Sequence, residues 1–127
     1  MTAATTVGRQ VTEAITNHPV NQDGYQFAVP TFTTDEQVAR FTAIAFKVTK
    51  QTETRNGVYW EAQVTDGTFV MAAENRGDGG ANWYYADDKA GQRALEAFAT
   101  ELFPGNGEAL DTLVMAVDMY QDMQAGA

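Results

Sequence analysis

The chain contains no cysteine and only one histidine, and these two shortages exclude several kinds of chemistry. Without cysteine the protein can form neither a disulfide framework nor a reactive thiolate. Neither a histidine-based catalytic triad nor a zinc site with the usual His and Cys ligands can be assembled around His18 alone. His18 precedes Pro19 in an expected turn, so we interpret it as a surface residue without a catalytic role.

Positive charge is also scarce. Eight Lys and Arg residues face seventeen Asp and Glu residues, which gives a net charge of −9. The segment from Ala94 to Ala127 contains six acids and no Lys or Arg. Binding to duplex DNA needs a positive surface, so we expect no direct contact with nucleic acid. An acidic face suits a basic protein surface, although acidity also serves plain solubility.

Long apolar runs are missing as well. No run approaches the ~20 apolar residues that a membrane helix needs, and residues 1–6 lack the layout of a signal peptide. The chain has 127 residues, of which 44% are hydrophobic, so we expect a single globular domain over residues 1–127. Together with the lack of cysteine, this predicts a cytoplasmic protein without membrane contact.

The first half of the chain predicts alternating short elements. A short helix capped by Thr5 or Thr6 is expected first, and Asn17-His18-Pro19 should end it. A short strand over Tyr25–Val29 should follow. Thr34–Gln37 matches a capping box that starts a second short helix. Residues 42–54 are compatible with helix and with strand, and their many β-branched side chains favour a strand.

The middle of the chain predicts an antiparallel meander. Asn56-Gly57 and Asp66-Gly67 are favoured two-residue hairpin turns, and apolar and polar residues alternate between them. Trp60 lies on the apolar face and should be largely buried. A last strand is expected over residues 82–86, which gives four strands, or five if Tyr25–Val29 joins the edge.

Two helices follow this sheet. Asp87 or Asp88 should cap the first, Pro104-Gly105 should end it, and the last helix should run from about Gly107 to Met123. The order of elements predicts an α+β fold, an antiparallel meander of four to five strands with helices packed on one face.

One candidate binding surface is the glycine-rich loop and the aromatic strand after it. Its residues are Asn75, Arg76, Gly77, Asp78, Gly79, Gly80, Asn82, Trp83 and Tyr85. The loop can be an ordinary wide turn with a positive φ at Gly79 or Gly80, a backbone nest for an anion, or a docking site for a protein. A calcium site is less well supported, because Asp78 is the one carboxylate in the loop.

A resemblance is carried by the same region. The pattern Thr52-Glu53-Thr54, Tyr59-Trp60-Glu61-Ala62, Asp66-Gly67 and Asn75-x-Gly77-x-Gly79-Gly80-x-Asn82-x-Tyr84 is similar to one that recurs in small uncharacterised bacterial and prophage proteins. The match spans roughly Thr49 to Tyr85. The resemblance implies a mobile-element protein and implies no catalytic residues.

The last helix supplies a second candidate surface. At 100° per residue, four acids fall on one side, next to a methionine, and should be exposed for binding a partner. These residues are Glu108, Asp111, Asp118, Asp122 and Met115. The opposite side of this helix should form part of the core.

The functional expectation is a non-enzymatic protein that needs neither cofactor nor metal. No phosphate-binding loop with its lysine is present, and the paired carboxylates are explained by helix capping. We expect a small acidic interaction protein of phage or mobile-element type that occupies a basic surface of a nucleic-acid-handling host protein, for example to inhibit a defence nuclease. The alternative is a small-ligand or nucleotide-binding module that uses the glycine-rich loop.

Overall fold

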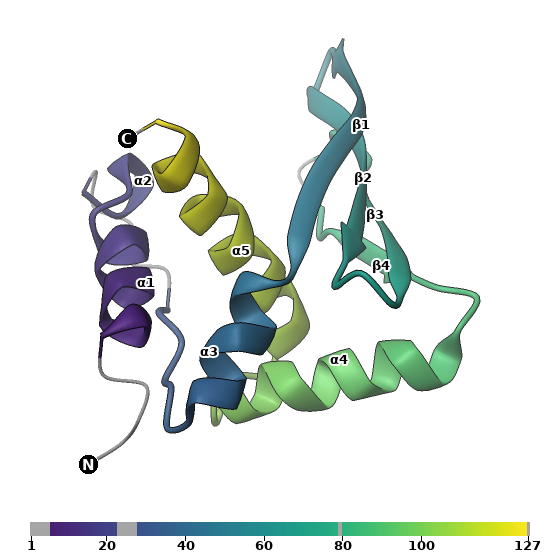
Figure 1. Cartoon of the computed structure of the whole chain (residues 1–127). Helices are drawn as coiled ribbons and strands as arrows, with labels where there is room; N and C mark the ends of the chain where they lie inside the picture. The colour runs from purple at the N-terminus through teal and green to yellow at the C-terminus, as the bar shows by residue number, and fades with distance from the viewer. Residues whose placement is uncertain (1–5, 23–27, 79, 127) are drawn as a thin grey trace.

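The computed structural model describes residues 6–22, 28–78 and 80–126, and in these residues it shows five helices and four strands (Figure 1). The elements are α1 (Val7–Thr16), α2 (Pro19–Gln22), α3 (Asp35–Thr42), β1 (Ala45–Thr54), β2 (Gly57–Thr65), β3 (Val70–Asn75), β4 (Trp83–Tyr85), α4 (Lys89–Leu102) and α5 (Ala109–Ala125). The strands form one antiparallel sheet in the order β1-β2-β3-β4, so the predicted α+β meander is confirmed. Most of the strand expected at Tyr25–Val29 lies outside the described residues.

Local capping signals determine where two helices begin. The Thr34 hydroxyl accepts a hydrogen bond from the Gln37 N–H at 3.2 Å, and the Gln37 side chain accepts one from the Thr34 N–H at 3.3 Å. Asp88 caps α4, because its Oδ1 accepts from the Gly91 N–H at 2.9 Å. Both caps agree with the sequence patterns, since each satisfies backbone donors that a helix start leaves free.

The first hairpin differs from the predicted two-residue Asn56-Gly57 turn. Thr54 pairs with Gly57, so the loop between β1 and β2 consists of Arg55 and Asn56. No described residue other than glycine has a positive φ, whereas the predicted turn requires one at Asn56. The strand pairing is therefore shifted, and Gly57, with φ of 151°, becomes the first residue of β2.

The second hairpin also differs from its prediction. Thr65 pairs with Val70, which leaves a four-residue loop in place of Asp66-Gly67. The Asp66 carboxylate closes this loop, because its Oδ1 accepts hydrogen bonds from the Thr68 N–H at 3.0 Å and the Phe69 N–H at 3.1 Å. The strand pairing is shifted by two residues from the predicted one. Because side chains alternate with a period of two, the same side chains still face the core.

The hydrophobic core combines side chains from one face of the sheet with side chains from the helices. The buried face of the sheet carries Phe46, Ala62, Val64, Met71 and Ala73. Helix α5 contacts β1 on one side and α1 on the other, and it also packs on α4 (Figure 1). Because α5 has neighbours on several sides, it buries more of its surface than an ordinary amphipathic helix.

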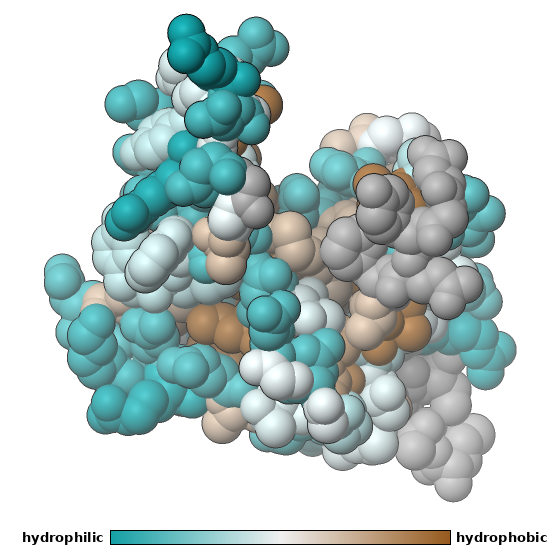
Figure 2. Space-filling model, turned by 180° about the vertical axis from the view of Figure 1, so that it is seen from behind, coloured by the Kyte–Doolittle hydropathy of each residue, from teal (hydrophilic) through white to brown (hydrophobic). Residues whose placement is uncertain are grey.

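Trp60 lies at the margin of this core. Its side chain is half-buried, and its ring meets the Phe46 ring edge-on at a centroid distance of 5.6 Å. The prediction that Trp60 is largely buried is therefore wrong in degree, although the inward direction is correct. Beyond it the β1–β2 hairpin projects from the body as an arm in which no residue from 47 to 58 is buried (Figure 1). Figure 2 shows this arm as a mostly hydrophilic projection.

None of the described helices is both long and apolar enough to cross a lipid bilayer.

Candidate functional site

The structure brings the two candidate surfaces together at one carboxylate. The Asn82 side chain donates a hydrogen bond from Nδ2 to Asp111 Oδ1 at 2.8 Å, and the Tyr84 hydroxyl donates to the same oxygen. The glycine-rich loop and the start of α5, which the sequence treats as separate surfaces, therefore form one site. Tyr84 was not among the predicted site residues. The sequence did contain a signal for Tyr84. Neighbouring strand residues point to opposite faces, so a residue between the outward-facing Trp83 and Tyr85 must point inward.

Polar side chains of the loop hold its own backbone. Asn75 Oδ1 accepts from the Gly77 N–H at 2.8 Å, and Asp78 Oδ1 accepts from the Gly80 N–H at 2.9 Å. Asn75 Nδ2 also donates to Asn82 Oδ1 at 2.8 Å. Since two of the backbone N–H groups already have partners inside the loop, they are not free to bind an anion. This weakens the anion-nest interpretation and supports the ordinary loop chemistry.

Among the described residues of the glycine-rich loop, Gly77 is the glycine with a positive φ. Its φ is +73°, and a Cβ atom there would lie 2.9 Å from the Tyr59 backbone nitrogen. Gly80 does not have a positive φ, and Gly79 lies outside the described residues, so the expected special geometry is absent at Gly80. Gly77 therefore lets the loop pass close to β2, which no other residue type would allow without displacement.

A pocket of about 570 Å³ lies between the loop and the two C-terminal helices. It is lined by residues of the segments 80–84 and 106–111 and by two side chains of α4. The polar lining consists of Asn82, Tyr84, Glu96, Thr100, Asn106, Glu108 and Asp111. We call it the loop–helix pocket. Its described lining includes three carboxylates and no Lys, Arg or His, so its charge favours a positively charged group.

Tyr84 is held in its protonated form in this site. Burial, followed by the hydrogen bond to Asp111, raises the pKa of Tyr84 well above its usual range. The hydroxyl therefore stays protonated and donates its hydrogen bond at neutral pH. Within the described residues, both bonds to Asp111 reach Oδ1, and Oδ2 has no hydrogen-bond partner. Asp111 is thus oriented by two uncharged donors and keeps one oxygen for a ligand.

The predicted acidic stripe on α5 is only partly exposed. Glu108 and Asp122 are exposed, but Asp111 and Asp118 are half-buried, so the prediction of four exposed acids is wrong for these two. Burial, followed by the negative charge of Asp122, raises the pKa of Asp118 above its ordinary value. Met115, predicted as an exposed partner contact, is half-buried and packs against the core. The cause is the close packing of α5 on several neighbours.

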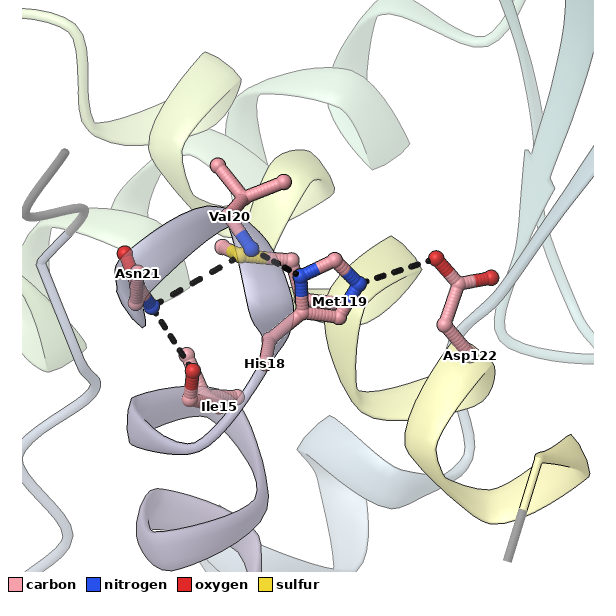
Figure 3. Close-up of polar contacts among 6 residues, drawn as sticks. All are labelled: Ile15, His18, Val20, Asn21, Met119 and Asp122. Carbon is pink, nitrogen blue, oxygen red and sulfur yellow. Dashed lines mark hydrogen bonds and ion pairs between the residues drawn. The ribbon is translucent and has the colours of Figure 1, made fainter. Parts of the chain in front are cut away.

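His18 is buried, which corrects the prediction of a surface histidine. Its exposed fraction is 9%, and its Nε2 lies 3.1 Å from Asp122 Oδ2 (Figure 3). Its Nδ1 accepts a hydrogen bond from the Val20 N–H at 3.2 Å, so a neutral ring carries its proton on Nε2 and donates it to Asp122. His18 thus fastens the turn between α1 and α2 to the end of α5 (Figure 3).

The aromatic residues of β4 that point away from the pocket remain accessible. Trp83 is 52% exposed and Tyr85 is 49% exposed. The Arg76 guanidinium lies 4.7 Å from the centre of the Trp83 ring, a distance typical of a cation–π contact. These three residues of the predicted loop surface are therefore available to a partner, on the side of β4 opposite Tyr84.

In the described part of the chain, no group of three or more His, Asp or Glu residues could hold a metal ion. Comparison of the chain with protein-family models, with curated proteins and with solved structures finds no match. A functional proposal for this chain is therefore supported by its own geometry and charge.

Proposed function

We propose that the chain is a small acidic, non-enzymatic interaction protein that binds a basic surface of another protein. The loop–helix pocket receives a Lys or Arg side chain of that partner. One observation carries the proposal, namely that the end of the loop, the start of α5 and Glu96 of α4 line one pocket, which has three carboxylates and no described cation in its lining. An unbalanced negative pocket attracts a cation and repels an anion.

The arrangement of Asp111 supports tight binding of one basic group. Tyr84 and Asn82 hold this carboxylate in place before a partner arrives, so little side-chain ordering is required on binding. Glu108 is exposed at the rim, where a charge mainly speeds the encounter. The net charge of −9 adds a long-range attraction for basic partners.

The class of partner follows from the same charge. Six acids and no cation lie between Ala94 and Ala127, and such a concentration of negative charge can imitate the phosphates of a nucleic acid. We therefore propose a nucleic-acid-handling host protein, such as a defence nuclease, as the target, and a phage or other mobile element as the origin. The resemblance to prophage proteins is the support for that origin.

The pocket also supports a narrower form of the alternative function. A volume of about 570 Å³ is within the range of small-molecule sites. Its carboxylates favour an amine or a guanidinium compound as the ligand and disfavour a nucleotide, whose phosphates would meet Glu96, Glu108 and Asp111.

The test is calorimetric titration with a nine-residue arginine peptide at 50 mM salt. The double variant Glu96→Gln/Glu108→Gln removes two pocket charges, and Glu13→Gln/Glu36→Gln removes two exposed charges on α1 and α3 as the matched control. The pocket variant should bind about tenfold more weakly, since a close charge pair contributes about 1.5 kcal/mol or more. The control should change binding by less than about threefold.

Two outcomes would contradict the proposal. Equal weakening in both variants would show that only the overall charge attracts the peptide. Stabilisation of the fold by ATP, and not by the arginine peptide, would favour the nucleotide alternative. Urea unfolding of each variant checks that folding is intact.

A further inference from the structure

The solvent side of the sheet carries an aromatic surface that the loop–helix pocket does not use. Trp83 pairs with Glu74 and Tyr85 pairs with Ala72, while Glu74 pairs with Glu61 and Ala72 pairs with Gln63. Paired residues share a face, and alternate residues of the same strands form the buried face. We call the outward group the outer sheet face, defined by Tyr59, Glu61, Gln63, Glu74, Trp83 and Tyr85.

Two of the three aromatic rings of the outer sheet face, those of Tyr59 and Trp83, contact a neighbouring side chain. Trp83 and Tyr85 stand two positions apart on β4, which is about 7 Å along a strand. Tyr84, between them, is fixed on the other side by its hydrogen bond to Asp111. The Arg76 guanidinium lies over the Trp83 ring at 4.7 Å, and the Tyr59 hydroxyl donates to Glu61. An exposed ring that a neighbour already contacts, as Arg76 contacts Trp83, loses less side-chain freedom when it binds a ligand.

The charges of this face are mixed, unlike those of the C-terminal helices. Residues 45–93 contain six cations and seven acids, whereas residues 94–127 contain six acids and no cation. On the outer sheet face, Glu61 and Glu74 stand between Lys50 and Trp83 in one cross-strand row. The two acids in the middle of the row repel phosphates, so a single-stranded nucleic acid does not suit this face. Lys50 and Arg76 lie beside these acids and repel a strongly basic ligand.

A neutral carbohydrate chain has the complementary chemistry. Each sugar ring has an apolar C–H face that can lie on an aromatic ring, and a rim of hydroxyl groups that both donate and accept hydrogen bonds. Carboxylates and amides beside aromatic rings match that pattern, and the sheet presents them as an open row that suits a chain. We infer that the outer sheet face binds a neutral glycan, whose rings stack on Trp83 and Tyr85 and whose hydroxyls bond to Glu61, Gln63 and Glu74.

The test uses the fluorescence of Trp83. The chain has two tryptophans, so Trp60→Phe leaves Trp83 as the only reporter. Titration with cellohexaose, chitohexaose and maltohexaose should give a saturable change in emission with at least one of the three. Adding Tyr85→Ala should weaken that binding by about 5- to 10-fold, as the loss of one aromatic contact does. If Trp60→Phe folds poorly, calorimetry can compare oligosaccharide binding by the unaltered chain with binding by the Tyr85→Ala variant.

The control is the Glu96→Gln/Glu108→Gln variant, which should bind the same oligosaccharide with unchanged affinity. A failure of the pocket proposal therefore leaves this inference intact, and the reverse also holds. No saturable change with any of the three oligosaccharides would overturn the inference. Quenching by oligo-dT in place of the oligosaccharides would overturn it as well, and would assign the face to single-stranded nucleic acid.

Discussion

The two ends of helix α5 use a similar carboxylate in different ways. Near the start, Asp111 is half-buried and accepts hydrogen bonds from Asn82 and Tyr84, neither of which is charged. Near the end, the Asp122 side chain is 60% exposed and meets His18, a group that can change its charge. Each carboxylate holds a segment that lies far away in the sequence. Helical spacing groups the two acids correctly, but only the packed structure separates an anchored carboxylate from an exposed one.

The largest expected effect is the loss of stability on removing the Asp111 carboxylate, which is compared with the smaller loss on removing Asp122. Asp111→Ala should lower the free energy of unfolding by about 2 kcal/mol, because it leaves the Tyr84 hydroxyl and the Asn82 amide without their acceptor in a partly buried place. Asp122→Ala should lower it by about 0.5 kcal/mol, since its side chain is mostly exposed. Urea unfolding at pH 7 measures both values.

Glu108→Ala is the control for this pair, because Glu108 is an exposed acid at the start of the same helix. It should change stability by no more than about 0.5 kcal/mol. Equal losses from Asp111→Ala and Asp122→Ala would remove the contrast between the two ends of α5.

A double-mutant cycle sharpens the same comparison. Tyr84→Phe combined with Asp111→Asn should give a coupling energy of about 1–2 kcal/mol, since the hydrogen bond joins a buried hydroxyl to a charged acceptor. His18→Gln combined with Asp122→Asn should give about 0.5 kcal/mol at pH 8. A larger coupling at the His18 end would show that solvent weakens that contact less than its exposure indicates.

Local sequence signals predicted the parts of this fold that depend on near neighbours. The capping box at Thr34 and the cap at Asp88 each involve residues within three positions. The strand favoured over residues 42–54 is confirmed for Ala45–Thr54, where β-branched side chains favour extended backbone, whereas Thr42 is the last residue of α3. The same local rules failed at both hairpins, where the partners of Thr54 and Thr65 are each two residues away from the predicted ones.

The candidate site depended on contacts that no local rule contains. Gly77 is special because the loop passes against the backbone of Tyr59 on another strand. His18 is buried because the turn after α1 packs against α5, whose Asp122 lies 104 positions away. The pairing of Tyr84 with Asp111 likewise joins an edge strand to a helix. Sequence patterns selected the glycine-rich loop and the last helix as candidate surfaces but not α4, and tertiary packing decided which side chains of these segments meet.

The smallest expected effect concerns Asp118, which lies between the two ends of α5. Burial and the charge of Asp122 raise the pKa of Asp118, so its ionisation is less favourable in the folded chain than in the unfolded one. Its contribution to stability is therefore fully present below the unfolded pKa of about 3.9 and is lost as the pH rises through the higher folded value. Asp118→Asn should raise the free energy of unfolding at pH 7 by about 0.5 kcal/mol or less, and by nothing at pH 3.

The pH dependence of the stability gained by Asp118→Asn tests the cause of that gain as well as its size. Asp87→Asn, at an exposed position before α4, is the control and should change stability at pH 7 by no more than about 0.5 kcal/mol. In a chain that already carries Asp122→Asn, the gain from Asp118→Asn should shrink, because one of the two charges that repel each other is gone. A loss of stability from Asp118→Asn at pH 7 would mean that attraction to His18 outweighs burial at this end of the helix, and the two ends of α5 would then both hold favourably placed carboxylates.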